Sequence, residues 1–328
     1  MRETIISTSG LTKRYGDLVA VNELDLTIGK GEVYGLLGPN GAGKSTTILL
    51  LLGLAEASAG KAMVCGFNPA THAIEVRRRV GYLPDDVGFY DSRSGLENLL
   101  FTARLNSIAK DEARRRAWQI LEQVGLASDA EKKTGTYSRG MRQRLGLADV
   151  LIKKPSVIIL DEPTLGIDPQ GVREFLDLIV RLSREQELTV LLSSHHLHQV
   201  QQVCDKVGLF VDGKLIADGT IDALSAKLFA SEPLFVEVGF AVRNGATQMN
   251  PDELMPLTDR IRRIEGVGSV GFAEGILRVG CVNDPSSAIA RAIFDAGYDL
   301  TLLQKTRYGL DEIYHRYFQE RETYGKTA

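Results

Sequence analysis

The chain is poor in cysteine and aromatic residues and has no long hydrophobic run. Its three cysteines, Cys65, Cys204 and Cys281, are far apart and fit no metal-ligand spacing, so we expect buried, reduced thiols. The longest apolar run, around residues 48–54, is far shorter than the roughly 20 residues that span a bilayer. The N-terminus has no apolar signal segment. These absences predict a chain without a secretory signal or a transmembrane helix, located in the cytoplasm.

The chain also lacks a large excess of positive or negative charge. The formal net charge is −3 over 328 residues, so no general basic field indicates nucleic-acid binding. The hydrophobic content of 44% and the charged content of 25% are those of an ordinary folded protein. The length allows one large domain or two ordinary ones.

One glycine-rich segment carries the strongest signal. Residues 38–46 have the sequence GPNGAGKST and match the phosphate-loop pattern GxxxxGK[ST] between two apolar runs, which predicts strand, loop and helix. The glycines allow backbone N–H groups to surround phosphates, and the helix N-terminus adds positive potential. The alternative is a glycine-rich turn that binds no ligand. Such a turn would not need a strand before it and a helix after it, so the flanking apolar runs favour the phosphate loop. The predicted nucleotide-binding residues are Gly38, Asn40, Gly41, Gly43, Lys44, Ser45 and Thr46, with Lys44 on the β- and γ-phosphates and Ser45 on Mg²⁺.

A second segment places two carboxylates after a buried strand. Residues 157–160 are all apolar, as in a strand covered on both faces, and Asp161 and Glu162 follow. Ligands of α/β sheets bind at this end of the strands. Asp161 therefore suits a Mg²⁺ ligand, and Glu162 suits a base that polarises the attacking water. Taken alone, the segment would also fit a strand that ends in solvated acids.

With these motifs in order, the chain resembles the ATP-binding subunit of ATP-binding-cassette (ABC) transporters over about residues 4–225. The resemblance implies that Tyr15 stacks on adenine, a contact that an aromatic face makes with any base. Without it, Tyr15 would be a partly buried strand residue. It further implies that Asp168 is the aspartate of the loop after the second motif, and that His195 is the switch histidine near the γ-phosphate.

Residues 136–143, TYSRGMRQ, occupy the place of the family signature. Ser138 is a good N-cap for the helix that follows, and Gly140 permits close backbone approach. An ordinary capped helix would have the same features. The resemblance implies instead that Ser138 and Gly140 close on the ATP of a second cassette, so that two ATP molecules lie between two subunits.

The sequence departs from the family pattern at two places. Asp85 stands where the family usually has a glutamine that touches Mg²⁺ and the membrane partner. Asp85 is able to ligate Mg²⁺ directly, although it is shorter and adds charge, and Asp86 is an alternative for the role. In the signature, Tyr137 and Arg139 replace the usual leucine and first glycine. Both kinds of substitution occur in the exporter branch of the family.

Other charged and polar clusters have simpler interpretations. A metal site at His195, His196 and His198 is less favoured than a phosphate sensor and an exposed helix face. The arginines at 77–79 and 114–116 are balanced by nearby acids and fit solvated helix faces rather than nucleic-acid patches. No guanine-reading NKxD motif is found, which disfavours a GTPase.

The resemblance and the pattern of elements predict two domains. The first, residues 1–228, is an α/β P-loop ATPase core of ABC type, with an antiparallel β subdomain and an inserted helical subdomain at about 85–150. The second, residues 229–328, is a small α+β domain whose βαββαβα order suggests a ferredoxin-like fold, ending in a helix at 310–318. We expect it to set dimer contacts or partner recognition, with small-ligand regulation as the alternative.

The predicted function is that of the ATP-binding and ATP-hydrolysing subunit of an ABC exporter of the ABC-2 type, with ATP and Mg²⁺ as cofactors. Its expected partners are separate transmembrane permease subunits and a second ATP-binding subunit, either a second copy or a sister cassette, at the cytoplasmic face of the membrane. No nucleic-acid partner is expected. The alternative is a soluble ABC ATPase that acts on ribosomes or DNA, but such proteins commonly carry two cassettes, coiled-coil arms or zinc-finger insertions.

Overall fold

The computed structural model describes residues 3–228, 234–242, 254–273, 275–282, 284–305, 310 and 312–314. The chain divides into two compact units, Met1–Leu224 and Ser225–Ala328. Each unit has its own hydrophobic core. The functional roles predicted for the two parts remain predictions.

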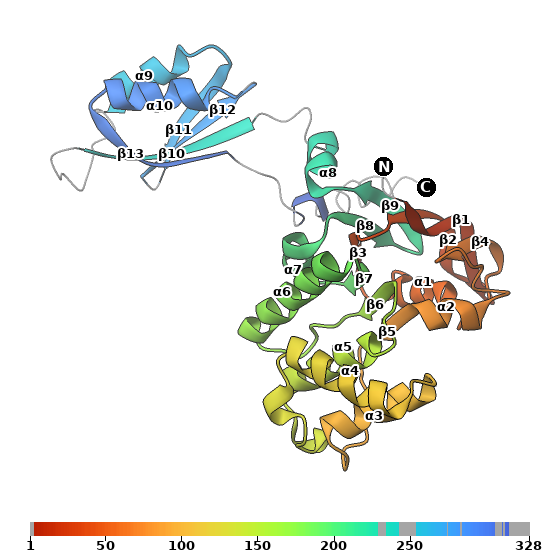
Figure 1. Ribbon diagram of the computed structural model, residues 1–328. Helices are drawn as coiled ribbons and strands as arrows, with labels where there is room; N and C mark the ends of the chain where they lie inside the picture. The colour runs from red at the N-terminus through yellow and green to blue at the C-terminus, as the bar shows by residue number, and fades with distance from the viewer. Residues whose placement is uncertain are drawn as a thin grey trace. The chain divides into compact units, whose positions relative to one another are not determined.

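The main sheet of the first unit has six strands in the order β5-β6-β7-β3-β8-β9 (Figure 1). All neighbouring pairs are parallel except β8 and β9, which are antiparallel and form a hairpin. Strands β3, β6 and β7 are buried along their whole length, as the apolar runs of β3 and β6 predict. The strands are β3 (Val33–Leu37), β5 (Val80–Leu83), β6 (Val157–Asp161), β7 (Thr189–Ser194), β8 (Lys206–Val211) and β9 (Lys214–Gly219).

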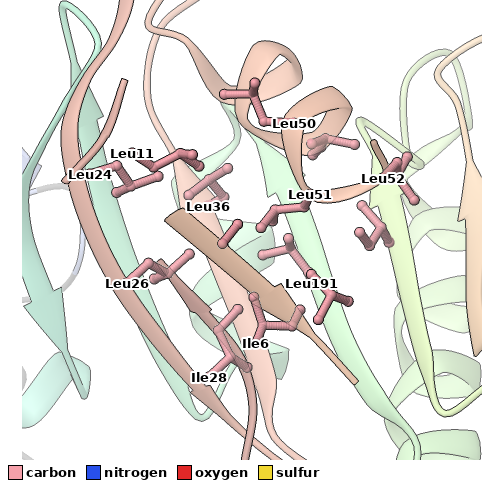
Figure 2. Packing of buried hydrophobic residues seen from close by; sticks show 14 of the residues in the cluster. Ile6, Leu11, Leu24, Leu26, Ile28, Leu36, Leu50, Leu51, Leu52 and Leu191 are labelled. Atoms are coloured by element: carbon pink, nitrogen blue, oxygen red, sulfur yellow. The ribbon is translucent and has the colours of Figure 1, made fainter. Parts of the chain in front are cut away.

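A second sheet is antiparallel and has the order β2-β1-β4, with β1 at Thr4–Tyr15, β2 at Leu18–Gly29 and β4 at Ala59–Val64. Its inner face packs against the main sheet and against α1 (Lys44–Leu51). Figure 2 shows this core, in which leucine and isoleucine side chains from both sheets and the helix lie together. This packing fixes the start of α1, and therefore the loop before it, relative to both sheets. Labelled there are Ile6, Leu11, Leu24, Leu26, Ile28, Leu36, Leu50, Leu51, Leu52 and Leu191.

The stretch between β5 and β6 is helical, and Figure 1 shows its helices gathered below the main sheet. A capping box begins the first of them, since Ser94 Oγ accepts from Glu97 N and Glu97 Oε2 accepts from Ser94 N. Helices of this group contact one another and α6. They are α3 (Gly95–Leu105), α4 (Lys110–Gln123), α5 (Arg139–Leu151) and the short 3₁₀ turns η1 (Ala127–Asp129) and η2 (Thr134–Thr136).

Four further helices complete the first unit. The long amphipathic helix α6 buries an apolar face that includes Phe175 and Ile179. The arginine runs lie on helix surfaces, where Glu75 pairs with Arg79 and Glu112 pairs with Arg116, as predicted. The helices are α2 (Ala73–Arg79), α6 (Pro169–Gln186), α7 (Leu197–Val203) and α8 (Ile221–Leu228), the last of which crosses into the second unit.

The second unit contains a four-stranded antiparallel sheet in the order β11-β12-β10-β13. Its core is formed by apolar residues of the strands and of both helices, among them Val238, Ile261, Leu277 and Ile293. The order βαββαβ is the one predicted. Of the predicted last helix, residues 310 and 312–314 are helical and the remainder lies outside the described residues. The elements are β10 (Leu234–Val242), α9 (Met255–Arg262), β11 (Val267–Ala273), β12 (Ile276–Cys281), α10 (Ser286–Asp295) and β13 (Tyr298–Lys305).

The cysteines are unpaired thiols, but only Cys281 is fully buried, whereas Cys65 and Cys204 are half-buried. The expectation of three buried thiols was therefore wrong for two of them. Burial still raises the pKa of Cys65 to about 11, which keeps that thiol protonated at neutral pH. None of the helices in the described part of the chain has both the length and the apolar character needed to cross a bilayer.

Candidate active site

The phosphate loop, residues 38–46, joins the end of β3 to the start of α1, as predicted. Gly43 precedes the helix with φ of 102°, and a Cβ there would lie 2.3 Å from the carbonyl oxygen of Ala20. Both the backbone angle and the close approach require glycine. Gly38 is likewise confined, because a Cβ would lie 2.3 Å from the carbonyl oxygen of Phe210. The loop is thus pressed against the neighbouring sheet and held in one conformation.

Lys44 is the first residue of α1 and is only 5% exposed. Its Nζ donates to the carbonyl oxygens of Gly38 at 2.7 Å and Pro39 at 3.2 Å. The same nitrogen lies 3.5 Å from Glu162 Oε1. A buried ammonium is stable only with such partners, which here place a positive charge beneath the loop.

The two predicted carboxylates lie at the end of β6. Asp161 is buried and accepts a hydrogen bond from Ser193 Oγ on the neighbouring strand β7. Glu162 leaves the strand in the left-handed region with φ of 46°, and its N–H donates to Ser193 O at 3.2 Å. An L-residue in this conformation is strained and needs such support. The turn directs the Glu162 side chain toward the end of β7.

His195 follows β7 and lies beside Glu162. The distance from His195 Nδ1 to Glu162 Oε2 is 2.9 Å. A carboxylate accepts hydrogen bonds, so His195 donates its Nδ1–H in this contact. His196 stacks obliquely beside it with 4.0 Å between ring centroids, and desolvation together with the charge of His195 lowers the pKa of His196. His196 is exposed and stands at the N-cap position of α7 without a side-chain cap, in agreement with the predicted surface position.

These groups share one cleft of about 780 Å³. The predicted residues that line it are Tyr15, Asn40, Gly41, Gly43, Lys44, Ser45, Thr46, Asp85, Asp161, Glu162 and His195. Tyr15 is 49% exposed, so a broad aromatic face is available, and Lys13 Nζ lies 4.8 Å from its ring centroid. The cleft therefore joins an aromatic wall, a phosphate loop and two acidic strand ends.

Asp85 lies at the acidic end of the cleft and is exposed. Its Oδ1 accepts from Asp86 N at 2.9 Å, which turns the loop after β5. Burial and the negative charges of Asp161 and Asp85 raise the pKa of the neighbouring Tyr82 phenol to about 12. The acidic cluster thus lies in a part of the structure that favours a bound cation.

Four predicted residues lie outside the lining of the cleft. Gly38 is buried under the phosphate loop. Ser138 caps α5 by accepting from Met141 N at 3.2 Å, and Asp168 caps α6 by accepting from Gly171 N at 3.1 Å. Ser138 and Asp168 are exposed and Gly140 is half-buried, and none of the three lines the cleft of its own chain.

Sequence reasoning missed part of the cleft wall. Gly213, in the β8–β9 turn, donates its N–H to Ala42 O at 3.0 Å and accepts from Asn22 N at 2.8 Å. The turn reaches the loop because β8 pairs directly with β3, a neighbourhood that no local pattern encodes. The missed lining residues are Leu18, Val19, Ala20, Ala42, Leu165, Asp212 and Gly213.

Comparison with known proteins agrees with this geometry. Residues 21–165 match the ABC transporter family. The bacitracin transport ATP-binding protein BcrA of Bacillus licheniformis is 41% identical over 224 residues, which cover 68% of this chain and 72% of that protein. The chain belongs to the ATP-binding proteins of ABC transporters. It is therefore an ATP-binding subunit with ATPase activity, of the kind that works with transmembrane subunits, and the predicted family and fold are confirmed.

One relative is similar over nearly the whole chain, and solved structures are similar over about 70% of it. The daunorubicin resistance ATP-binding protein DrrA3 of Streptomyces coeruleorubidus is 36% identical over 318 residues, which cover 96% of each chain. Among solved structures, cbiO1 of Clostridium perfringens, part of the ABC transporter complex cbiONQ, is 30% identical with a TM-score of 0.63 over 70% of this chain and 92% of that one. An ATP-binding subunit of another ABC transporter is 28% identical with a TM-score of 0.61, covering 69% of this chain and 94% of that one.

Proposed function

We propose that this subunit powers an exporter of amphipathic, drug-like compounds through separate transmembrane subunits. The observation that supports this most is the similarity to a daunorubicin resistance protein over 96% of each chain, which includes the second unit as well as the cassette. The similarity to a bacitracin transport protein indicates the same class of cargo. The membrane subunits supply the path, and the subunit acts at the cytoplasmic face of the membrane.

The residues of the cleft fit a magnesium nucleotide. Ser45, Asp161 and Asp85 offer hydroxyl and carboxylate oxygens, the donors that Mg²⁺ prefers, at the acidic end. Within the described residues, the buried Glu162 Oε1 accepts no hydrogen bond, so one strong acceptor is left for a polar ligand. Bound Mg²⁺ would offset the negative charge of the phosphates.

The chain's own groups account for the hydrolysis. Lys44 and the backbone N–H groups of residues 38–46 bind the phosphates, and the face of Tyr15 stacks on the adenine. Glu162 orients the attacking water and accepts its proton. His195 holds the Glu162 carboxylate through Nδ1–H and itself lines the cleft.

The signature segment acts on a second cassette. Ser138, Gly140 and Asp168 lie outside the cleft of their own chain and near two capped helix N-termini, α5 and α6. A helix N-terminus carries partial positive charge and attracts phosphate. Two subunits that face each other therefore enclose two ATP molecules, and hydrolysis separates them. The second subunit is a further copy of this chain or a sister cassette.

Two substitutions test the assignment of the hydrolysis residues. Glu162→Gln should reduce turnover by about 10²–10⁴-fold while ATP binding persists, because a positioned base is lost and the phosphate loop is intact. Lys44→Ala should instead weaken ATP binding itself. Turnover would be measured by phosphate release and binding by equilibrium dialysis of ATP with Mg²⁺. Glu185→Gln, the same change at an exposed position of α6, is the matched control and should keep normal turnover. Normal turnover by Glu162→Gln would reject the assignment.

A further inference from the structure

Arg139 connects the signature helix to both acidic loops of the cleft. It is the first residue of α5, directly after the capping Ser138. Its Nη2 donates to the carbonyl oxygen of Asp85 at 2.9 Å, and its Nε donates to the carbonyl oxygen of Leu165 at 3.2 Å. These acceptors are 54 and 26 residues away in the sequence. One guanidinium thus holds two separate loops to the start of one helix.

Both loops are part of the site. Asp85 and Leu165 line the cleft, and Leu165 N donates to Glu162 O at 3.2 Å. The turn that carries the proposed base is therefore fastened to Arg139 through Leu165. The neighbouring Gly166 has φ of 75°, and a Cβ there would lie 3.7 Å from Arg139 Cγ. The arginine stem packs along this turn.

The backbone contacts carry more weight than the ion pair. Arg139 Nη1 lies 3.7 Å from Asp86 Oδ1, but the Asp86 side chain is 89% exposed, so water and salt screen this pair. The two carbonyl bonds need a planar fork with donors at fixed angles, which arginine has and lysine lacks. The contact therefore depends on shape as well as on charge.

We propose that Arg139 is a positioning residue that couples the signature helix to the two loops beside the hydrolysis residues. When Ser138 and Gly140 close on the nucleotide of the facing subunit, Arg139 transmits that placement to Asp85 and to the turn after Glu162. Hydrolysis then proceeds only in a closed pair. Arg139 departs from the family pattern in the signature, and its contact at residue 85 is with the backbone carbonyl oxygen, so it does not depend on the aspartate side chain there. This inference rests on the proposed function as an ATPase that works in a pair.

The test compares Arg139→Ala and Arg139→Lys with Arg144→Ala in the full chain. Arg144 lies on the same helix and also bonds one carboxylate, Glu174 at 2.7 Å, and one carbonyl, Val124 O at 3.2 Å, but neither borders the cleft. With ATP and Mg²⁺, both Arg139 variants should lose about tenfold in kcat, since misalignment of reacting groups is costly, and KM for ATP should change less than about twofold. Arg144→Ala should match the original chain.

Amide hydrogen exchange gives the second readout. In both Arg139 variants, peptides that cover residues 84–91 and 163–168 should exchange faster than in the original chain and in Arg144→Ala. Frayed α5 alone would change only the peptide that begins at 139. The inference would be overturned if Arg139→Ala kept the kcat and the amide exchange of the original chain. It would also be overturned if Arg139→Lys had the kcat of the original chain, or if Arg144→Ala lost as much kcat as Arg139→Ala. If Arg139→Ala does not fold, Arg139→Lys carries the comparison. An original chain that neither binds nor hydrolyses ATP would instead reject the proposed function.

Discussion

Three polar side chains of the cleft, those of Lys44, Glu162 and His195, lie in a row. They do so because the three strands that precede them are neighbours in one sheet. The order β6-β7-β3 places the ends of these strands side by side, and the resulting distances are 3.5 Å from Lys44 to Glu162 and 2.9 Å from Glu162 to His195. The pairing of Lys44 with Glu162 offsets the cost of burying these two charges. The positions of these three residues therefore depend on the order of the strands. The glycines of the phosphate loop determine how closely the start of α1 approaches the neighbouring strands.

The glycines of the phosphate loop allow a prediction at this scale. Gly43 and Gly41 both have positive φ, but a Cβ at Gly43 would meet Ala20 O at 2.3 Å, whereas a Cβ at Gly41 meets nothing within 4 Å. Both alanine variants incur about 1–2 kcal/mol for the left-handed backbone. Gly43→Ala should cost about 1–3 kcal/mol more because the backbone must shift. Urea unfolding of both variants measures the difference. Equal midpoints would contradict this account of the loop.

At the scale of elements, the site depends on where helices begin. Strand β6 ends at Asp161, while α5 and α6 begin behind the capping residues Ser138 and Asp168. The cap at Ser138 is a local signal, so the sequence alone located it, whereas Asp168 was predicted as a loop aspartate and not as a cap. Helix α3 also begins behind a local cap, the capping box of Ser94 and Glu97, but this cap was not predicted.

Removing the α3 cap should destabilise the helical group. Ser94→Ala leaves the N–H of Glu97 without its acceptor and should lower the free energy of unfolding by about 1 kcal/mol. Ser128→Ala is the control, because the exposed Ser128 hydroxyl bonds only the adjacent Asp129 carboxylate among the contacts described for it. Its effect should stay within about 0.5 kcal/mol. Urea unfolding measures both, and a Ser94→Ala chain as stable as the Ser128→Ala chain would refute the cap.

Features that depend on residues close together in the sequence could be predicted, and contacts between residues far apart in the sequence could not. Buried strands such as β6 are continuous apolar runs, and the phosphate loop has a fixed spacing, so both were predicted within a residue or two. Strand β4 was not, because its half-exposed sequence shows no alternation. The contact of Arg139 with Asp85 spans 54 residues and depends on how α5 packs beside β5. Local patterns carry no information on such pairs.

At the scale of the whole molecule, the two units have separate cores. Leu191 lies in the core of the first unit, and Leu277 lies in that of the second. Both side chains are fully buried. Two cores without shared members favour two unfolding transitions, of which only the first should respond to ATP.

Core substitutions separate the two transitions. Leu277→Ala should cost about 2–5 kcal/mol and lower only the second transition, and Leu191→Ala should lower only the first. ATP with Mg²⁺ should raise the first transition in the Leu277→Ala chain as much as in the original chain. Differential scanning calorimetry measures all three. A single transition that both variants shift would contradict independent units.

A subunit that hydrolyses ATP for membrane-embedded partners should co-purify with those partners, and one purification tests this most directly. The Glu162→Gln chain, held in its ATP-bound form, would be purified from detergent-solubilised membranes of its source cells with ATP and Mg²⁺ present, beside Lys44→Ala as control. We expect a hydrophobic protein with several membrane spans to accompany Glu162→Gln and to identify the transporter. Recovery from the soluble fraction together with ribosomal proteins or nucleic acid would contradict the account and indicate a soluble ATPase.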